Sequence, residues 1–194
     1  MTKRWLGLSI LLASQTLLSG CAPVVVGGAA TTVAVAHDRR TTGSVVEDQA
    51  IKARVITALK DDSEIDRQTH INVTSFNGIV LLTGEAPTDS LRSRVGNIAR
   101  NSEKVRRVHN EIVIAAPSSM MTRSSDSWIT TKVKTALLGV GEEGFDATRV
   151  KVVTENGTVY LLGLVTQREA SAATEQARQI GGVQRIVKLF EYLD

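Results

Sequence analysis

Apolar residues recur at helical spacing in two stretches of the chain, one near residue 50 and one near residue 130. The two apolar sets are Ile51, Val55, Ala58 and Leu59, and Ile129, Val133, Ala136 and Leu137. Spacings of three and four residues place each set on one side of an α-helix, so each stretch predicts an amphipathic helix with one buried face. Asp48 and Asp126 precede these sets, and we expect them at the helix starts, where free backbone amides favour a carboxylate.

Two short β-rich runs follow each predicted helix, and an Asn-Gly pair separates the two runs. In the first stretch Asn77-Gly78 lies between residues 71–74 and 79–82, and in the second Asn156-Gly157 occupies the same place. Both residue types tolerate a positive φ, which makes this pair the strongest short-range signal for a β-hairpin. Each stretch therefore predicts a helix followed by a tight hairpin.

A second helix and a closing strand complete each pattern. We expect helices over residues 88–101 and 167–180, and closing strands over residues 105–114 and 183–192. The order αββαβ predicts an α+β fold, in which each copy forms a three-stranded mixed sheet with two helices on one face. Four glycines are expected to be structural, because they lie in the hairpin turns or after the second strands, where a positive φ or a close backbone approach is common: Gly78, Gly84, Gly157 and Gly163.

The two patterns are copies of one unit. Residues 48–59 align with 126–137, residues 77–84 with 156–163, and residues 105–108 with 183–186, all in the same order. The expected organisation is a signal peptide at 1–20, a lipidated N-terminus and tether at 21–45, a first domain at 46–116, a linker at 117–125 and a second domain at 126–194. A domain of about 70 residues has a marginal core on its own, so the two copies are expected to pack together.

The N-terminus has the features of an export signal. Lys3 and Arg4 precede an apolar run over residues 5–18, which is shorter than the roughly 20 residues that a membrane-spanning helix needs. The run ends in Leu18-Ser19-Gly20-Cys21, which resembles the lipobox of bacterial lipoproteins. That resemblance implies that Cys21 is acylated and becomes the new N-terminus, and that Ala22 after it favours sorting to the outer membrane. A plain secretory peptide, leaving Cys21 as a free thiol, is the alternative.

The duplicated αββαβ pattern resembles the BON domain, with Gly84 and Gly163 following the second strands. Together with the lipobox it is similar to outer-membrane lipoproteins that carry two BON domains, over residues 46–194. The resemblance implies a lipid-anchored protein of the outer membrane that faces the periplasm and supports envelope integrity. It also implies anionic phospholipid, such as phosphatidylglycerol or cardiolipin, as the ligand, with cell-division sites as one place where such lipid gathers.

The charge balance of the mature chain argues against nucleic acid as a partner. The whole sequence has 23 basic and 20 acidic side chains, but Lys3 and Arg4 leave with the signal peptide. The mature protein is therefore nearly neutral, whereas a nucleic-acid-binding domain usually keeps a basic excess.

No motif in the sequence predicts catalysis, a cofactor or a metal. Residues 139–144 satisfy the pattern G-x-G-x-x-G, but they follow a predicted helix rather than a strand, and Glu142 and Glu143 would repel phosphates. His37, His70 and His109 have no second ligand at metal spacing, and Cys21 is the single cysteine. We therefore expect a protein that is not an enzyme.

The first helices of the two copies differ on one face. In the second copy this face consists of Trp128, Thr131, Lys132, Thr135 and Leu138, where the first copy has Ala50, Ala53, Arg54, Thr57 and Lys60. Tryptophan favours the membrane–water interface, and lysine can extend its charge towards headgroups, so we predict phospholipid binding by this face together with Lys134. Two alternatives stay open: Trp128 packs against the first domain, or the second domain grips an envelope protein partner as a scaffold.

Overall fold

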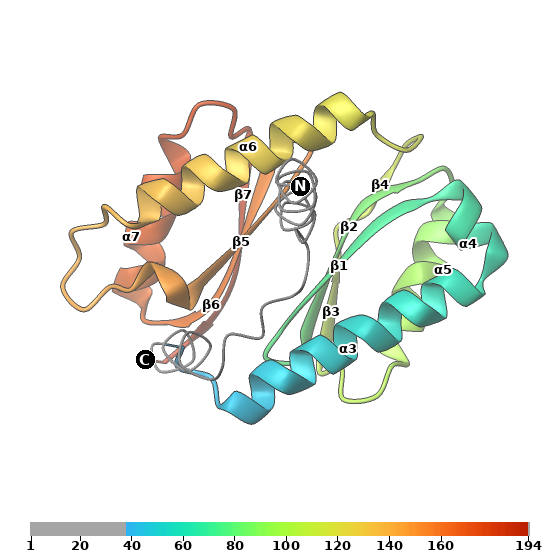
Figure 1. The fold of residues 1–194 in the computed structure, drawn as a ribbon, viewed down its shortest axis with the longest axis horizontal. Coiled ribbons are helices and arrows are strands. Elements are labelled where there is room, and N and C mark those ends of the chain that lie inside the picture. Colours follow the sequence, from blue (N-terminus) through green and yellow to red (C-terminus); the bar gives the residue numbers. More distant parts are fainter. Residues whose placement is uncertain (1–37, 194) are drawn as a thin grey trace, which may run out of the picture. The chain divides into compact units, whose positions relative to one another are not determined.

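The computed structural model describes residues 38–193, so the predicted signal peptide, Cys21 and the first part of the tether lie outside the described residues. The first copy contains helices α3 (Thr42–Asp61), α4 (Ser63–Gln68) and α5 (Asp89–Arg100) and strands β1 (His70–Phe76), β2 (Ile79–Ala86), β3 (Arg107–Asn110) and β4 (Val113–Ile114) (Figure 1). The second copy contains helices α6 (Met120–Leu137) and α7 (Gln167–Arg178), a 3₁₀ turn η2 (Ala147–Arg149), and strands β5 (Val150–Glu155), β6 (Thr158–Val165) and β7 (Arg185–Tyr192).

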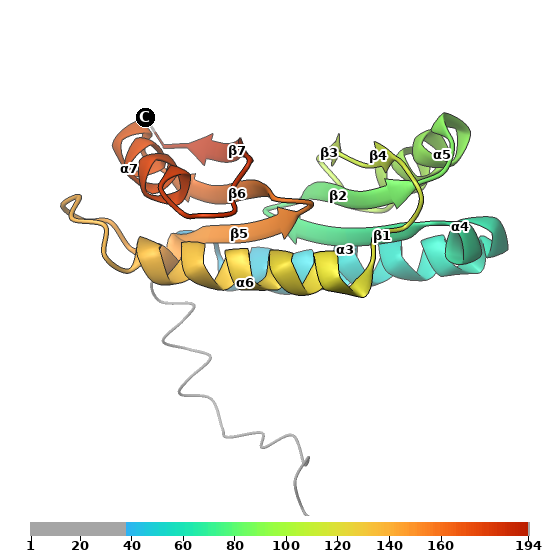
Figure 2. The same cartoon turned by 90° about the horizontal axis from the view of Figure 1, so that it is seen from above.

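Each copy forms a mixed sheet, and the predicted α+β fold is confirmed. In the first copy β1 pairs antiparallel with β2, and β2 pairs parallel with β3 and β4. In the second copy β5 pairs antiparallel with β6, and β6 pairs parallel with β7. The first helix of each copy runs beside the first strand, α3 beside β1 and α6 beside β5 (Figure 2).

The closing strand of the first copy differs from the prediction, because it is interrupted between β3 and β4. Ile112 turns into the core, where it is 2% exposed. The Asn110 side chain stabilises this break by donating to the Arg92 carbonyl oxygen at 3.0 Å and accepting from the Ile112 amide at 3.3 Å. The second copy lacks this break, and β7 pairs with β6 along its whole length.

The helices of each copy pack on one face of their own sheet. Residues from α3, α5 and the alternate positions Val80 and Leu82 of β2 form one buried cluster. The equivalent cluster of the second copy combines α6 and α7 with Val159 and Leu161 of β6. Because successive side chains of a strand point to opposite faces, these clusters account for only half of each central strand.

The other half of each central strand contributes to a core that the two copies share. Leu81 of β2 and Leu162 of β6 are fully buried in one cluster with Phe76 and Tyr160. Every residue of β2 is buried for this reason. The expected packing of the two copies on each other is thus present, and it covers the sheet faces that a single copy would expose.

The starts of the first helices were predicted wrongly. Helix α3 begins at Thr42 and α6 at Met120, because the hydroxyls of Thr41 and Ser119 cap these helices and accept from the backbone amides of Ser44 and Thr122, three residues on. Residues 42–45 of the expected tether and 120–125 of the expected linker are therefore helical. Asp48 and Asp126 lie inside the helices and are buried.

The two buried aspartates instead hold the hairpin turns. Asp126 accepts hydrogen bonds from the backbone amides of Asn156 and Gly157 at 2.8 and 2.9 Å. Asp48 accepts from the amides of the equivalent turn in the first copy, at 2.6 and 2.9 Å. Each aspartate therefore joins the first helix of its copy to the hairpin, which explains why both copies have an acidic residue at this position.

Candidate functional site

The outward face of α6 carries exposed apolar side chains. Trp128 is 64% exposed, Leu138 is 75% exposed, and Met120 and Met121 are 74% and 84% exposed. The Trp128 indole is therefore not buried against the first copy, which was the alternative that the sequence left open for this residue. Met120 and Met121 continue the exposed apolar side chains to the N-terminal end of α6, about two turns before Trp128. The sequence did not reveal them, because their segment resembled a linker.

The opposite face of α6 is buried and fixes the orientation of the helix. Asp126, Ile129, Val133 and Leu137 point into the second copy at spacings of three and four residues. Because these contacts hold one side of the helix against the sheet, the side that carries Trp128 faces outward without rearrangement.

Hydroxyl groups on the outward face of α6 are bonded to the helix itself. The Ser124, Ser127 and Thr131 hydroxyls each donate, at 3.0 Å, to the carbonyl oxygen four residues earlier. A hydroxyl that already has a backbone partner costs less to remove from water than a free one. These side chains therefore make the face less polar than its composition suggests.

The two predicted lysines have different environments. Lys132 donates from Nζ to the carbonyl oxygen of Gly181, so its ammonium is tied to the loop between α7 and β7. Lys134 is exposed, and no ion pair forms at either lysine among residues 38–193. Lys134 is therefore the cation of this helix that is better placed for an external anion.

Four of the predicted residues border one cavity of about 560 Å³. Thr131, Lys134, Thr135 and Leu138 of α6 line it, together with Arg40, Phe76 and Lys151. Trp128 and Lys132 lie outside this cavity. Arg40 and Lys151 were not predicted, because they are distant in the sequence and reach the cavity only through the folding of both copies.

Three cationic side chains, Arg40, Lys134 and Lys151, line the cavity next to α6. Burial lowers the pKa of the Lys151 ammonium, and the nearby charges of Arg40 and Lys52 lower this pKa further. The Arg40 guanidinium stacks on the Phe76 ring, 3.9 Å from its centroid, and pairs with Asp38 and Asp48 at 2.6 and 2.7 Å. An anion in this cavity would relieve the repulsion that Lys151 experiences.

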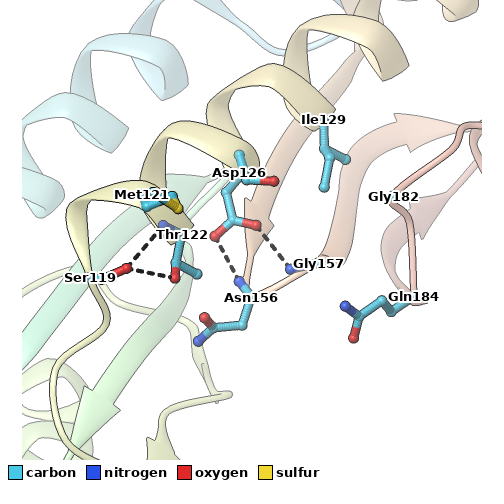
Figure 3. A pocket seen from close by; sticks show the side chains of 10 residues that line it. Ser119, Met121, Thr122, Asp126, Ile129, Asn156, Gly157, Gly182 and Gln184 are labelled. Carbon is cyan, nitrogen blue, oxygen red and sulfur yellow. Dashed lines mark hydrogen bonds between the residues drawn. The ribbon is translucent and has the colours of Figure 1, made fainter.

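A second cavity of about 560 Å³ lies at the N-terminal end of α6 (Figure 3). Its walls include Ser119, which caps the helix, and Asp126, whose two carboxylate oxygens accept from the turn amides of Asn156 and Gly157. Since both oxygens of Asp126 are occupied, this carboxylate holds the turn and is not available to a ligand.

The four predicted glycines occupy two kinds of position. Gly78 and Gly157 are in the hairpin turns with φ of 74° and 69°. Gly84 has φ of 111°, and a Cβ there would overlap the carbonyl oxygen of His70. Gly163 has no positive φ, but a Cβ there would lie 2.6 Å from the carbonyl oxygen of Arg149.

One group of side chains in residues 38–193 has the composition of a metal site. His70, Glu85 and Glu155 each offer a ligand atom, and these atoms lie within 4.8 Å of one another. Sequence spacing could not reveal the group, because its members come from both copies. Within the same described region, no helix is long and apolar enough to cross a membrane.

Comparison with known proteins gives consistent matches along the chain. Residues 47–116 and 125–194 each match the family profile described as BON domain. The outer membrane lipoprotein DolP of Haemophilus influenzae is 40% identical over 187 residues, which cover 96% of each chain. A 21 kDa hemolysin of Actinobacillus pleuropneumoniae is 40% identical over 80% of this chain and 79% of its own. Osmotically-inducible protein Y of Escherichia coli is 28% identical over 74% of this chain and 72% of its own.

Proposed function

This chain belongs to the BON domain family and carries two copies of the domain, and on that basis we propose that it is an outer-membrane lipoprotein whose second copy binds anionic phospholipid through α6. The observation that supports lipid binding most directly is the exposed apolar face of α6, with Trp128 64% and Leu138 75% exposed. The role is not enzymatic: the protein supports the envelope by holding a folded module at the membrane.

The proposed location is the periplasmic side of the outer membrane. A lipoprotein of that membrane is similar to this chain over nearly its full length, and Leu18-Ser19-Gly20-Cys21 fits a lipobox. Acylation of Cys21 would supply the anchor, with about 0.8 kcal/mol for each buried methylene group. The anchor confines the domains near the lipid surface, so even a weak contact through α6 becomes effectively intramolecular.

Binding through α6 would combine an apolar and an electrostatic contribution. The boundary between headgroups and acyl chains would take up Trp128 and Leu138, together with Met120 and Met121 at the N-terminal end of α6. Each apolar side chain that becomes fully buried contributes about 1.5–3 kcal/mol. A lysine near an anionic surface contributes about 1 kcal/mol. Lys134 can meet a phosphate directly, while Lys151 and Arg40 make the adjacent cavity favourable for a headgroup.

A lipid preference of this kind would concentrate the protein where anionic phospholipid is enriched, including cell-division sites. The anchor alone does not distinguish one region of the membrane from another. A second contact that requires negative headgroups would do so, because its strength follows the local surface potential.

Flotation with lipid vesicles tests the proposal on a soluble form without the acylated N-terminus. We expect binding to vesicles that contain phosphatidylglycerol or cardiolipin and little binding to phosphatidylcholine vesicles. Trp128→Ala should reduce the bound fraction strongly, whereas Tyr192→Ala, which removes an exposed aromatic ring from β7, should leave it unchanged. Equal flotation of wild type and Trp128→Ala would rule out this helix as the binding element.

Photo-crosslinking in cells separates lipid binding from a scaffold role. An apolar helix face also fits a groove in a partner protein, so a crosslinkable residue at position 128 would then give one dominant protein adduct. Lipid binding predicts adducts with phospholipid instead.

A further inference from the structure

Two buried glutamates from different copies come together at the contact between the sheets. Glu85 near the end of β2 is 1% exposed, and Glu155 at the end of β5 is 7% exposed. Within residues 38–193 neither carboxylate forms an ion pair with a lysine or arginine, and the nearest cationic candidate is His70, whose Nδ1 lies 3.4 Å from Glu85 Oε2. Two carboxylates removed from water without a cation are costly, so this arrangement needs a compensating charge.

Uncharged hydrogen-bond donors orient both glutamate side chains but leave lone pairs on the carboxylate oxygens that could coordinate a metal ion. Asn72 and Thr83 donate to Glu155 at 2.7 and 3.0 Å, and both hydrogen bonds fall on Oε2. The Asn156 side chain donates to Glu85 Oε1 at 2.6 Å, and the Ser118 amide donates to Oε2 at 3.2 Å. Such hydrogen bonds are typical around metal-binding carboxylates, because they fix the ligand without neutralising it.

His70 adds an unsatisfied nitrogen to the same place. Its Nδ1 is buried and has no hydrogen-bond partner, although it faces Glu85. Buried polar atoms in native proteins nearly always have a partner, and one that does not points to a bound water or ion.

We propose that His70, Glu85 and Glu155 bind one divalent first-row transition-metal ion, with Zn²⁺ as the best match to one imidazole and two carboxylates. Zinc binds nitrogen at about 2.0–2.1 Å and carboxylate oxygen at about 2.0–2.2 Å. The three ligand atoms lie within 4.8 Å of one another, so small side-chain rotations bring all three within coordination distance.

An entry path leads to the site from solvent. His70 and Glu155 line a cavity of about 220 Å³ together with Asn72 and Arg123. A water molecule from this cavity would complete a four-coordinate ion. Arg123 brings a positive charge to the cavity wall, held by donation to the Ser118 carbonyl oxygen at 2.8 Å, and this charge lowers the affinity for a cation without contributing a ligand.

Because the ligands come from both copies, metal binding would affect the contact between them. His70 and Glu85 belong to the first copy and Glu155 to the second. Binding would therefore cross-link the two copies at their contact and raise the stability of the whole, because the ion binds only the folded arrangement. None of the three ligands lies on α6, and the α6 residues that line the cavity are not those that carry the proposed lipid contact, so the metal site does not depend on lipid binding.

Metal titration of the mature lipoprotein in detergent tests the site. After treatment with a chelator, Zn²⁺ should bind with a stoichiometry of one and raise the melting temperature, and Co²⁺ should give the visible absorption of a coordinated ion. Glu155→Gln and His70→Asn should each weaken Zn²⁺ binding at least tenfold. Arg123→Met should strengthen it.

His109→Asn is the matched control, because His109 lies in β3 outside the ligand group. The Zn²⁺ affinity of this variant should equal that of the wild type. Melting of the metal-free variants shows separately that they are folded. Equal Zn²⁺ affinity in wild type, Glu155→Gln and His70→Asn would overturn the proposal, and so would the absence of saturable Zn²⁺ binding in the wild type.

Discussion

Helices α3 and α6 occupy the same place in the two copies, yet their outward faces have opposite character. On α3 the Arg54 guanidinium pairs with Glu47 at 2.7 Å, and Lys104 pairs with the same carboxylate at 2.8 Å. Hydrogen bonds from Lys104 and then Arg54 lower the pKa of Glu47. The outward face of α6 has no such network in the described chain, and it presents Trp128 and Leu138.

The inward faces of the same two helices make equivalent contacts with the hairpin of their own copy. Asp48 and Asp126 both accept hydrogen bonds from the hairpin amides of their own copy. Duplication therefore kept the contact that builds the fold and changed the surface that the fold presents. This contrast is the reason why we propose lipid contact for the second copy.

Alanine at Gly84 or Gly163, which lie within strands β2 and β6 rather than after them, should have the largest effect on stability. Gly163→Ala places a Cβ 2.6 Å from a backbone carbonyl oxygen that cannot move freely, so we expect a loss of about 3 kcal/mol or more. Gly84→Ala should cost more, because φ of 111° adds backbone strain to the overlap. Urea unfolding measures both, with Gly139→Ala as a control whose Cβ meets only ordinary contacts. Unchanged unfolding of Gly163→Ala would contradict the geometry.

Removal of either buried aspartate should lower the free energy of unfolding by less than the glycine substitutions do, and by a different amount in each copy. Asp126→Ala leaves two turn amides without acceptors, at about 1–3 kcal/mol for an unsatisfied buried group. Asp48→Ala should be the more destabilising of the two, because Asp48 also accepts from the Ser75 hydroxyl at 2.6 Å and pairs with Arg40. Thermal unfolding of both variants under one condition gives the ranking. The reverse ranking would show that the Arg40 pair contributes little.

The exposed apolar face of α6 around Trp128 could be predicted from the sequence, because it depends on a comparison between two aligned copies. Trp128 and Leu138 differ from Ala50 and Lys60 at positions that share a helix face, and helical spacing alone places them together. The full extent of the face could not be predicted. The cap at Ser119 lies in a serine-rich stretch that also resembles a linker, so the first turns of α6 were missed.

Features that depend on contact between the copies were beyond sequence reasoning. Periodicity identifies which residues of a strand share a face, but it does not say which residue of the other copy lies opposite. His70, Glu85 and Glu155 meet only through that contact, and Lys151 is half-buried beside Arg40 for the same reason. The break in the closing strand of the first copy was missed because it requires the tertiary partner of Asn110.

Exchange of the outward faces should change membrane binding while leaving stability almost unaltered. Trp128→Ala removes an exposed side chain, so the free energy of unfolding should change by no more than about 0.5 kcal/mol, while vesicle affinity falls at least tenfold. The reciprocal change, Ala50→Trp with Lys60→Leu on α3, should restore only part of the binding, because the Glu47 carboxylate stays near that surface. Full restoration on α3 would show that apolar area alone decides binding.

The smallest effect is expected at Lys151, which occupies in the second copy the strand position that Asn72 holds in the first. Burial, then the charges of Arg40 and Lys52, lower the pKa of Lys151 below 10.5, the usual value of a lysine side chain. The unfolded chain therefore binds more protons at this residue than the folded chain, and stability rises with pH between the lowered pKa and 10.5. Lys151→Met removes the unfavourable charge, so at neutral pH it should raise the melting temperature by about 2–4 °C.

That advantage should shrink as the pH approaches the upper end of the window, where the wild-type amine is neutral in the folded protein. Melting curves of wild type and Lys151→Met at neutral and alkaline pH measure the difference, with the exposed Lys134→Met as the control that removes the same charge from solvent. A less stable Lys151→Met at neutral pH would mean that the hydrogen bond from Nζ to the Ser75 carbonyl oxygen, at 3.3 Å, outweighs the cost of burying the charge. The Lys151 ammonium would then be stabilised by its own hydrogen bond, and a lipid phosphate in the cavity beside α6 would have no unfavourable positive charge to offset.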